Sequence, residues 1–157
     1  MKVYHPLNPI YNSESKIIIL GSMPSQKSRE EGFYYAHKTN RFWPVMEMIF
    51  KVKLNSNKEK ERFLLKNNIA LWDVIKSCDI NNSDDRSIKN VLFNDIDSLL
   101  NKTNIKYVFC TGKKAYNLFI KKYGYENIFC LSSPSSANAS KNIYDLVKEY
   151  EIIKKYL

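Results

Sequence analysis

Four short apolar runs occur along the chain, and each is followed by small or polar residues. They occupy residues 16–21, 69–73, 107–112 and 128–131. Continuous apolar runs of four to six residues are typical of strands that are buried on both faces, as in a parallel sheet. The pattern therefore predicts four buried strands.

Between these runs, apolar residues recur at helical spacing. The pattern predicts helices within residues 45–50, 59–67, 88–100, 115–119 and 143–157. Strands that alternate with helices indicate an α/β fold whose parallel sheet is covered by helices on both faces. Since the 157 residues contain no repeat or linker, we expect a single domain spanning 1–157.

Right-handed crossovers would place every strand-to-helix loop at one edge of this sheet, where ligands bind in folds of this class. Two of these loops are rich in small polar residues. One begins at Ser22 and continues as a polar and aromatic stretch to Phe42, and the other covers residues 132–139. Each alone is compatible with ordinary turns. Their expected convergence favours a binding site.

The charge balance indicates a polyanionic partner. The chain has 25 Lys and Arg against 16 Asp and Glu, a formal net charge of +9. Such an excess favours nucleic acid, and the predominance of Lys suits phosphate contacts. The alternative is that the lysines only maintain solubility.

Other classes of protein are disfavoured by what the sequence lacks. It has no P-loop, GxGxxG, HExxH or GxSxG motif, and only two histidines, of which we place His5 in an N-terminal tail. Cys78, Cys110 and Cys130 are odd in number and widely spaced, which fits reduced thiols in or near the core of a cytoplasmic protein. We expect no signal peptide and no membrane span, and therefore no membrane partner. The few histidines and the scattered cysteines predict no metal site, and no cofactor is expected.

Residues 32–44 combine five aromatic residues with cations and one Asn. Interleaved aromatic and cationic residues are what a surface for base stacking and phosphate contact requires. A structural interpretation makes Asn40 a helix N-cap and places Phe42 and Trp43 in the core. His37 lies within the same loop.

The segments LGSMPS, YYAHKTNRFWPVM, LWDVI, VFCTG and LSSPSSANA, in this order, resemble the uracil-DNA glycosylase superfamily. The closest similarity is to its sixth family, the hypoxanthine (deoxyinosine) DNA glycosylases. The resemblance implies a three-layer α/β/α sandwich with a short, mainly parallel four-stranded sheet. It also implies an enzyme that extrudes a deaminated base from DNA and hydrolyses its N-glycosidic bond without a metal or cofactor.

The resemblance assigns roles to individual residues. Asn40 would position the attacking water, and Tyr35 would stack on the extruded base. The base pocket would be formed by Gly21, Ser22, Met23, Pro24, Tyr35 and Phe42. The DNA-binding set would be Ser25, His37, Arg41, Ser133, Pro134, Ser135, Ser136, Ala137 and Asn138.

The chain departs from the family pattern at two places. Sister families have Asn or Asp at the Met23 position, but a Met cannot orient water. In the second motif, Ser132 and Ser136 replace prolines and Pro134 replaces Thr, which should loosen the loop that probes the minor groove.

Three further positions remain open. Asp73 could orient water instead of Asn40, or it could cap the following turn. Lys113 could contact a phosphate or lie on a solvated face, and Asp84 and Asp85 are expected to be solvated or to cap a helix at Ile88. No Lys lies within either core motif, which indicates a monofunctional glycosylase rather than a lyase.

We therefore expect a monomeric DNA glycosylase acting on DNA that contains a deaminated base. Hypoxanthine is the first expected substrate and uracil the second. A DNA-binding module that keeps the fold without hydrolysis is the alternative, and Met23 and the altered second motif favour it.

Overall fold

The computed structural model describes residues 1–82 and 84–157. Its central sheet contains the four predicted strands, in the order β3-β2-β6-β7, and every neighbouring pair is parallel. The strands are β2 (Ile17–Gly21), β3 (Ile69–Asp73), β6 (Tyr107–Thr111) and β7 (Ile128–Leu131). The predicted four-stranded parallel sheet is therefore confirmed.

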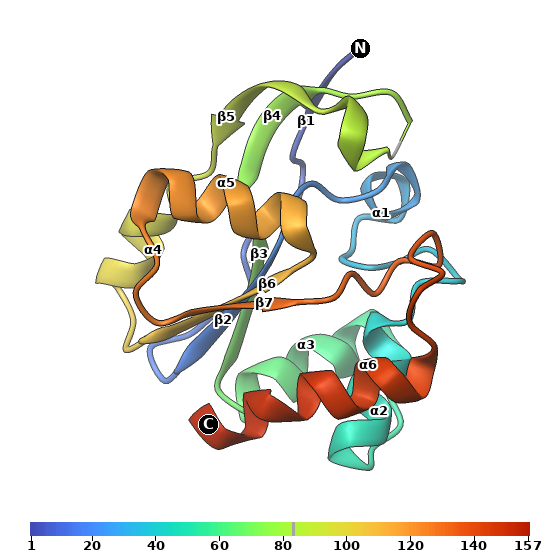
Figure 1. The fold of residues 1–157 in the computed structure, drawn as a ribbon. Helices are drawn as coiled ribbons and strands as arrows, with labels where there is room; N and C mark the ends of the chain where they lie inside the picture. The colour runs from blue at the N-terminus through green and yellow to red at the C-terminus, as the bar shows by residue number, and fades with distance from the viewer. Residues whose placement is uncertain (83) are drawn as a thin grey trace.

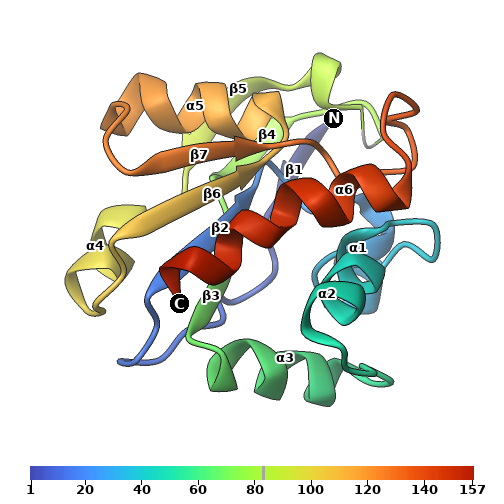
Figure 2. The ribbon, with the colours of Figure 1, turned by 60° about the horizontal axis from the view of Figure 1, so that its bottom comes forward.

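Helices cover both faces of this sheet, so the molecule has three layers (Figures 1 and 2). One face carries α2 (Phe42–Phe50), α3 (Asn57–Lys66), α6 (Ile143–Tyr150) and the short 3-10 helix η2 (Glu151–Tyr156). The other face carries α4 (Ile96–Asn101) and α5 (Lys113–Tyr123).

Strand β2 supplies both cores because successive side chains point to opposite faces. Ile17 and Ile19 pack with the layer of α2, α3 and α6, whereas Ile18 and Leu20 pack with the layer of α4 and α5. All four side chains are fully buried. The continuous apolar run is explained by this burial on both sides.

A second sheet, which is antiparallel and was not predicted, lies at the top of the molecule in Figure 1. It contains β1 (Lys2–Tyr4), β4 (Ile75–Asp79) and β5 (Lys89–Phe93) in the order β1-β4-β5. The single helix predicted over 88–100 is therefore wrong, since its first half is strand β5 and only its second half is helical, as α4.

Two short helices follow loops at the carboxyl end of the central sheet. Helix α1 (Gln26–Glu31) begins after Ser25, whose side chain accepts a hydrogen bond from the backbone N–H of Ser28, and ends at Gly32 with a φ of 74°. The 3-10 helix η1 (Asp85–Ser87) is capped by the Asp84 side chain, which confirms a capping role for Asp84 but not the helix expected at Ile88.

The N-cap predicted for α2 is displaced by one residue. The cap position is Arg41, without a side-chain capping bond. Asn40 still contributes, because its Oδ1 accepts a hydrogen bond of 2.9 Å from the backbone N–H of Phe42. Trp43 is buried as expected. No helix in the described part of the chain is long and apolar enough to cross a membrane.

Candidate active site

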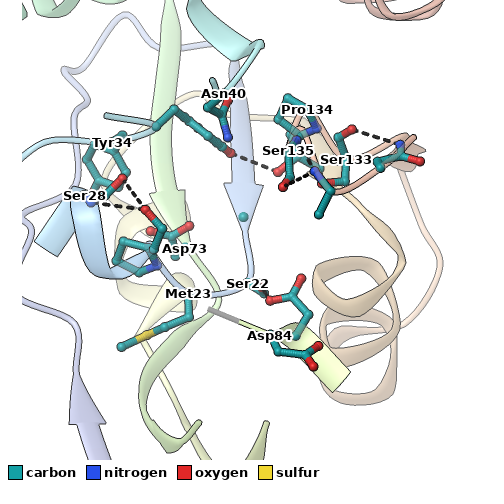
Figure 3. Close-up of a pocket in the computed structure, with 18 of the residues that line it drawn as sticks. Ser22, Met23, Ser28, Tyr34, Asn40, Asp73, Asp84, Ser133, Pro134 and Ser135 are labelled. Carbon is teal, nitrogen blue, oxygen red and sulfur yellow. Dashed lines mark hydrogen bonds between the residues drawn. The ribbon is translucent and has the colours of Figure 1, made fainter. Parts of the chain in front are cut away.

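The loops at the carboxyl ends of the parallel strands surround an open cavity of about 820 Å³. Most of the residues predicted for the base pocket and the second motif line it. Figure 3 shows Asn40 and the 133–135 segment on one side, with Ser22 and Asp84 opposite them. The predicted residues in its wall are Gly21, Ser22, Met23, Pro24, Ser25, Tyr35, Asn40, Asp73, Ser133, Pro134, Ser135, Ala137 and Asn138.

Tyr35 presents an aromatic surface to the cavity and is fixed from behind. Its ring stacks on Phe42 with centroids 4.1 Å apart and an interplanar angle of 14°. Its hydroxyl lies 2.9 Å from Thr111 Oγ1, and its φ of 51° is unusual for a bulky residue. Burial, and then the nearby Asp73 carboxylate, raise the pKa of the Tyr35 phenol, which therefore stays neutral.

Phe42, predicted to form part of the pocket, has a different position. It is fully buried and stands behind Tyr35, so it supports the pocket wall without reaching the cavity. The physical reason is that Phe42 begins helix α2, whose buried side also contains Trp43, Val45 and Met46.

Asn40 lines the cavity just before α2. The hydrogen bond from Phe42 N–H to its Oδ1 orients the carboxamide. An oriented carboxamide can hold a water molecule by hydrogen bonds, but it is a poor base. The geometry therefore fits a water-positioning group, which is the predicted role.

Arg41 joins this segment to the loop of the second motif. Its Nη2 donates to the carbonyls of Ser135 (2.7 Å) and Asn138 (3.0 Å). Its Nε and its backbone N–H both donate to the carbonyl of Pro134, and Nη1 donates to that of Lys141. The guanidinium thus holds the loop, a function that the predicted DNA-binding role did not include.

The first motif contacts a carboxylate that we expected to be solvated or capping. Ser22 Oγ donates to Asp85 Oδ1 over 3.1 Å, and Asp85 lines the cavity. Asp85 is exposed as a residue, yet partial burial of its carboxyl group raises the pKa, and the Ser22 hydrogen bond opposes that rise. Asp85 is thus exposed as a residue, as expected, but it begins η1 and does not cap a helix at Ile88, and its carboxylate also accepts from Ser22.

Asp73 does not cap the following turn. Its Oδ2 lies 2.7 Å from Nε2 of His5, and the two side chains are 5% and 1% exposed. His5 is consequently no part of a free tail. The pairing joins residues 68 positions apart, so no local pattern could have revealed it.

Other predicted residues lie outside the cavity wall. The exposed residues His37 and Ser136 both contact the Thr39 hydroxyl, at 2.8 and 2.9 Å, and thereby connect the two loops. Lys113 begins α5 at the same edge of the sheet. Their roles in binding DNA stay predictions.

Seven lining residues were not predicted as site residues. Tyr34, Ser28 and Thr111 belong to segments that come together only in the folded chain, and the remainder come from the β4–β5 region. Among the described residues, this set is Ser28, Tyr34, Ile80, Asp84, Asp85, Arg86 and Thr111.

Within the described residues, no group of three or more His, Cys, Asp or Glu side chains is arranged to hold a metal ion. Two cysteines, Cys78 and Cys110, are buried as expected, but Cys130 is exposed. Cys130 therefore lies outside the core, on β7 at the edge of the central sheet, and departs from the expected position in or near the core.

Comparisons with known proteins agree on one family. A family model described as the Uracil DNA glycosylase superfamily matches residues 9–155. A protein named hypoxanthine DNA glycosylase from Methanosarcina barkeri is 35% identical over 135 residues, covering 83% of this chain and 85% of the relative. A protein of the same name from Methanosarcina acetivorans is 30% identical over 139 residues, covering 85% and 88%.

A solved structure shows the same arrangement. It is a solution NMR structure described as that of a candidate uracil DNA glycosylase from Methanosarcina acetivorans. The two structures superpose with a TM-score of 0.79 at 28% identity, over 98% of this chain and 99% of the other.

Proposed function

The chain belongs to the uracil DNA glycosylase superfamily, and we propose that it removes deaminated bases from DNA, with hypoxanthine preferred over uracil. The observation that supports this most directly is the cavity that contains both Asn40 and Tyr35 at the carboxyl edge of the sheet. The relatives named hypoxanthine DNA glycosylase support hypoxanthine as a substrate.

The proposed reaction begins when the lesion nucleotide leaves the duplex and its base enters the cavity. Stacking on Tyr35 offsets part of the lost base stacking, since stacking on an aromatic side chain is worth about 1–3 kcal/mol. Phe42 holds the Tyr35 ring in place from behind. The loop of Ser133–Asn138 would occupy the gap in the duplex, and the hydrogen bonds from Arg41 that hold this loop support that role.

Cleavage of the N-glycosidic bond leaves positive charge on the sugar, and water completes the hydrolysis. Asn40 orients that water through its carboxamide, and no early proton removal is needed because the sugar cation is a strong electrophile. None of the described residues that line the cavity is a Lys. A hydrolytic reaction that leaves an abasic site, without strand cleavage by a Schiff base, is consistent with this.

The proposal is tested with matched duplexes that contain one deoxyinosine or one deoxyuridine. We expect strand scission only after alkali, and faster for deoxyinosine. Scission of the deoxyuridine strand alone would keep the enzyme class and reverse the substrate order. Binding of both duplexes without scission of either would favour the non-catalytic binding module, for which Met23 is the supporting observation.

A further inference from the structure

A buried histidine–aspartate pair lies at the wall of the cavity, and the reaction outlined above does not use it. Asp73 lines the cavity, and the imidazole of His5 lies behind it, with its side chain 1% exposed. Burial of a carboxylate is costly unless the charge is paired and hydrogen-bonded. The Nε2–Oδ2 distance of 2.7 Å shows that His5 supplies that partner.

The contact at the second ring nitrogen of His5 indicates which tautomer the side chain adopts. The backbone N–H of Leu7 donates to Nδ1 over 3.3 Å, so Nδ1 is an acceptor and the proton resides on Nε2. Nε2–H therefore donates to Asp73, which accepts as a carboxylate. A second proton on the ring would place two donors opposite each other at Nδ1.

The backbone around His5 holds the ring at this place. The N–H of His5 donates to the carbonyl of Lys76 over 2.8 Å. Further along, Ile10 and Leu71 exchange two backbone hydrogen bonds of 2.9 Å, and the Tyr34 hydroxyl donates to the carbonyl of Asn8. His5 is thus anchored on strands β3 and β4 by contacts on both sides of it.

The pairing determines which oxygen of Asp73 is left for a ligand. Oδ2 accepts from His5, and among the described residues no donor is hydrogen-bonded to Oδ1. Oδ1 lies against Gly21, where a Cβ would overlap it and would approach the Tyr35 hydroxyl to 3.2 Å. Gly21 therefore leaves the space in which a fixed anionic acceptor faces the cavity.

Deamination changes the ring nitrogen beside the exocyclic group from an acceptor to a donor, and an acceptor placed opposite that nitrogen can detect the change. Adenine N1 and cytosine N3 are acceptors, and a carboxylate oxygen repels them. Hypoxanthine N1 and uracil N3 carry a hydrogen in a lactam, next to a carbonyl group, and a carboxylate oxygen can accept it. The same acceptor thus suits deaminated purines and pyrimidines.

We propose that His5 is a positioning residue that holds Asp73 Oδ1 as the acceptor for the lactam N–H of the extruded base. This inference rests on the proposed glycosylase function and deepens it. It gives Asp73 a role in substrate selection, in place of the water-orienting role considered from the sequence.

The test compares two purine substrates under single-turnover conditions. One duplex carries deoxyinosine and the other carries 2′-deoxynebularine, whose base lacks both the N1–H and the carbonyl oxygen. The readout is the ratio of the two rates in the wild type, His5→Phe and His5→Gln. The intrinsic lability of each glycosidic bond and the effect of the missing carbonyl are common to all three proteins, so they cancel when the ratios are compared.

We expect His5→Phe to lower the deoxyinosine rate far more than the nebularine rate, reducing the ratio on the order of 10- to 100-fold, which is the usual contribution of one hydrogen bond to a charged group. His5→Gln, whose amide N–H can replace Nε2–H, should restore most of the ratio. Asp97→Asn, an exposed carboxylate on α4, is the matched control and should leave the ratio unchanged.

Asp73→Asn gives an independent test, because the Nε2 proton of His5 would determine how the new amide is oriented. His5 would hold the amide oxygen, so the NH₂ group would face the cavity and the polarity of the contact would be reversed. We expect the deoxyinosine rate to fall strongly and the nebularine rate, for a base with an acceptor at N1, to fall less. This variant retains the buried pair, so it keeps the proposal testable if His5→Phe fails to fold.

Suppose that the wild type releases hypoxanthine and that His5→Phe and Asp73→Asn each lower the rates on both substrates equally. That outcome would overturn the inference and leave the proposed function intact. Equal losses are what a purely structural pair, or an Asp73 that orients water, would give. Absence of base release from every deaminated substrate by the wild type would instead reject the proposed function, and the inference with it.

Discussion

Asn40 combines a structural and a proposed chemical role in one carboxamide, and the two can be separated by substitution. Asn40→Asp keeps an oxygen that can accept from the Phe42 N–H and removes the NH₂ group. Asn40→Ala removes both. Loss of an N-terminal helix contact of this kind costs about 0.5–2 kcal/mol of stability. The thermal midpoints of the two variants should therefore differ, with Asn40→Ala the lower.

Gly21 is predicted to be essential because of its neighbours. In Gly21→Ala the new methyl group would overlap Asp73 Oδ1 and crowd the Tyr35 hydroxyl, although the fully buried strand itself would tolerate alanine. We expect a loss of at least about tenfold in base release, since misplacement of a binding group by about 1 Å can cost on the order of 100-fold. The measurement is the single-turnover rate.

The matched control for that change is Gly124→Ala, at a glycine around which a Cβ would meet nothing within 4 Å. It occupies a left-handed conformation, so it should lower stability but not the rate of the folded enzyme. Unchanged activity in Gly21→Ala would contradict the close packing of Gly21, Asp73 and Tyr35.

At the scale of elements, the loop of the second motif depends on Arg41. The family pattern has prolines where this chain has Ser132 and Ser136, and the Arg41 guanidinium donates to four carbonyls within residues 134–141. Arg41→Met should therefore increase hydrogen exchange at residues 133–141. Arg62→Met, an exposed arginine of α3, is the control and should not.

Loosening this loop should affect catalysis in a specific way. A loop that fills the gap in the duplex matters most when the lesion is well paired, because extrusion is then most costly. We expect Arg41→Met to slow release from a paired duplex several-fold more than release from a single strand. Equal slowing on both substrates would argue against a role in extrusion.

The sequence predicted the elements that depend on local patterns. The four central strands are continuous apolar runs because both of their faces are covered, and helices α3, α5 and α6 follow from their apolar stripes. Strand β5 was missed because Val91 and Leu92 also fit helical spacing. In the structure Leu92 is 57% exposed, and Asn90, which has a positive φ, lies where the register of the pairing with β4 shifts, so the strand lacks a regular alternating pattern.

The same distinction applies to the site, where motifs along the chain could be recognised but contacts between distant segments could not. Asn40, Tyr35 and the second motif were found through a resemblance that preserves their order along the chain. The His5–Asp73 and Ser22–Asp85 contacts were not found, because each joins segments more than 60 residues apart and involves residues that are common on surfaces.

For the whole molecule, the net charge of +9 predicts strongly salt-dependent binding to DNA. Each phosphate neutralised on duplex DNA contributes about −0.9 to the slope of log K against log salt concentration. A slope corresponding to several phosphates, measured by fluorescence anisotropy, is expected. A flat response would mean that the basic residues serve solubility and do not contact DNA.

The most direct test of the account is the rate at which free hypoxanthine is released from a deoxyinosine duplex by the wild type and by Asn40→Asp, with DNA affinity measured in parallel. We predict release by the wild type, a loss of about 100-fold or more in the variant, and similar affinities for both proteins. Near-normal release by Asn40→Asp would contradict the assignment of Asn40 as the group that positions water.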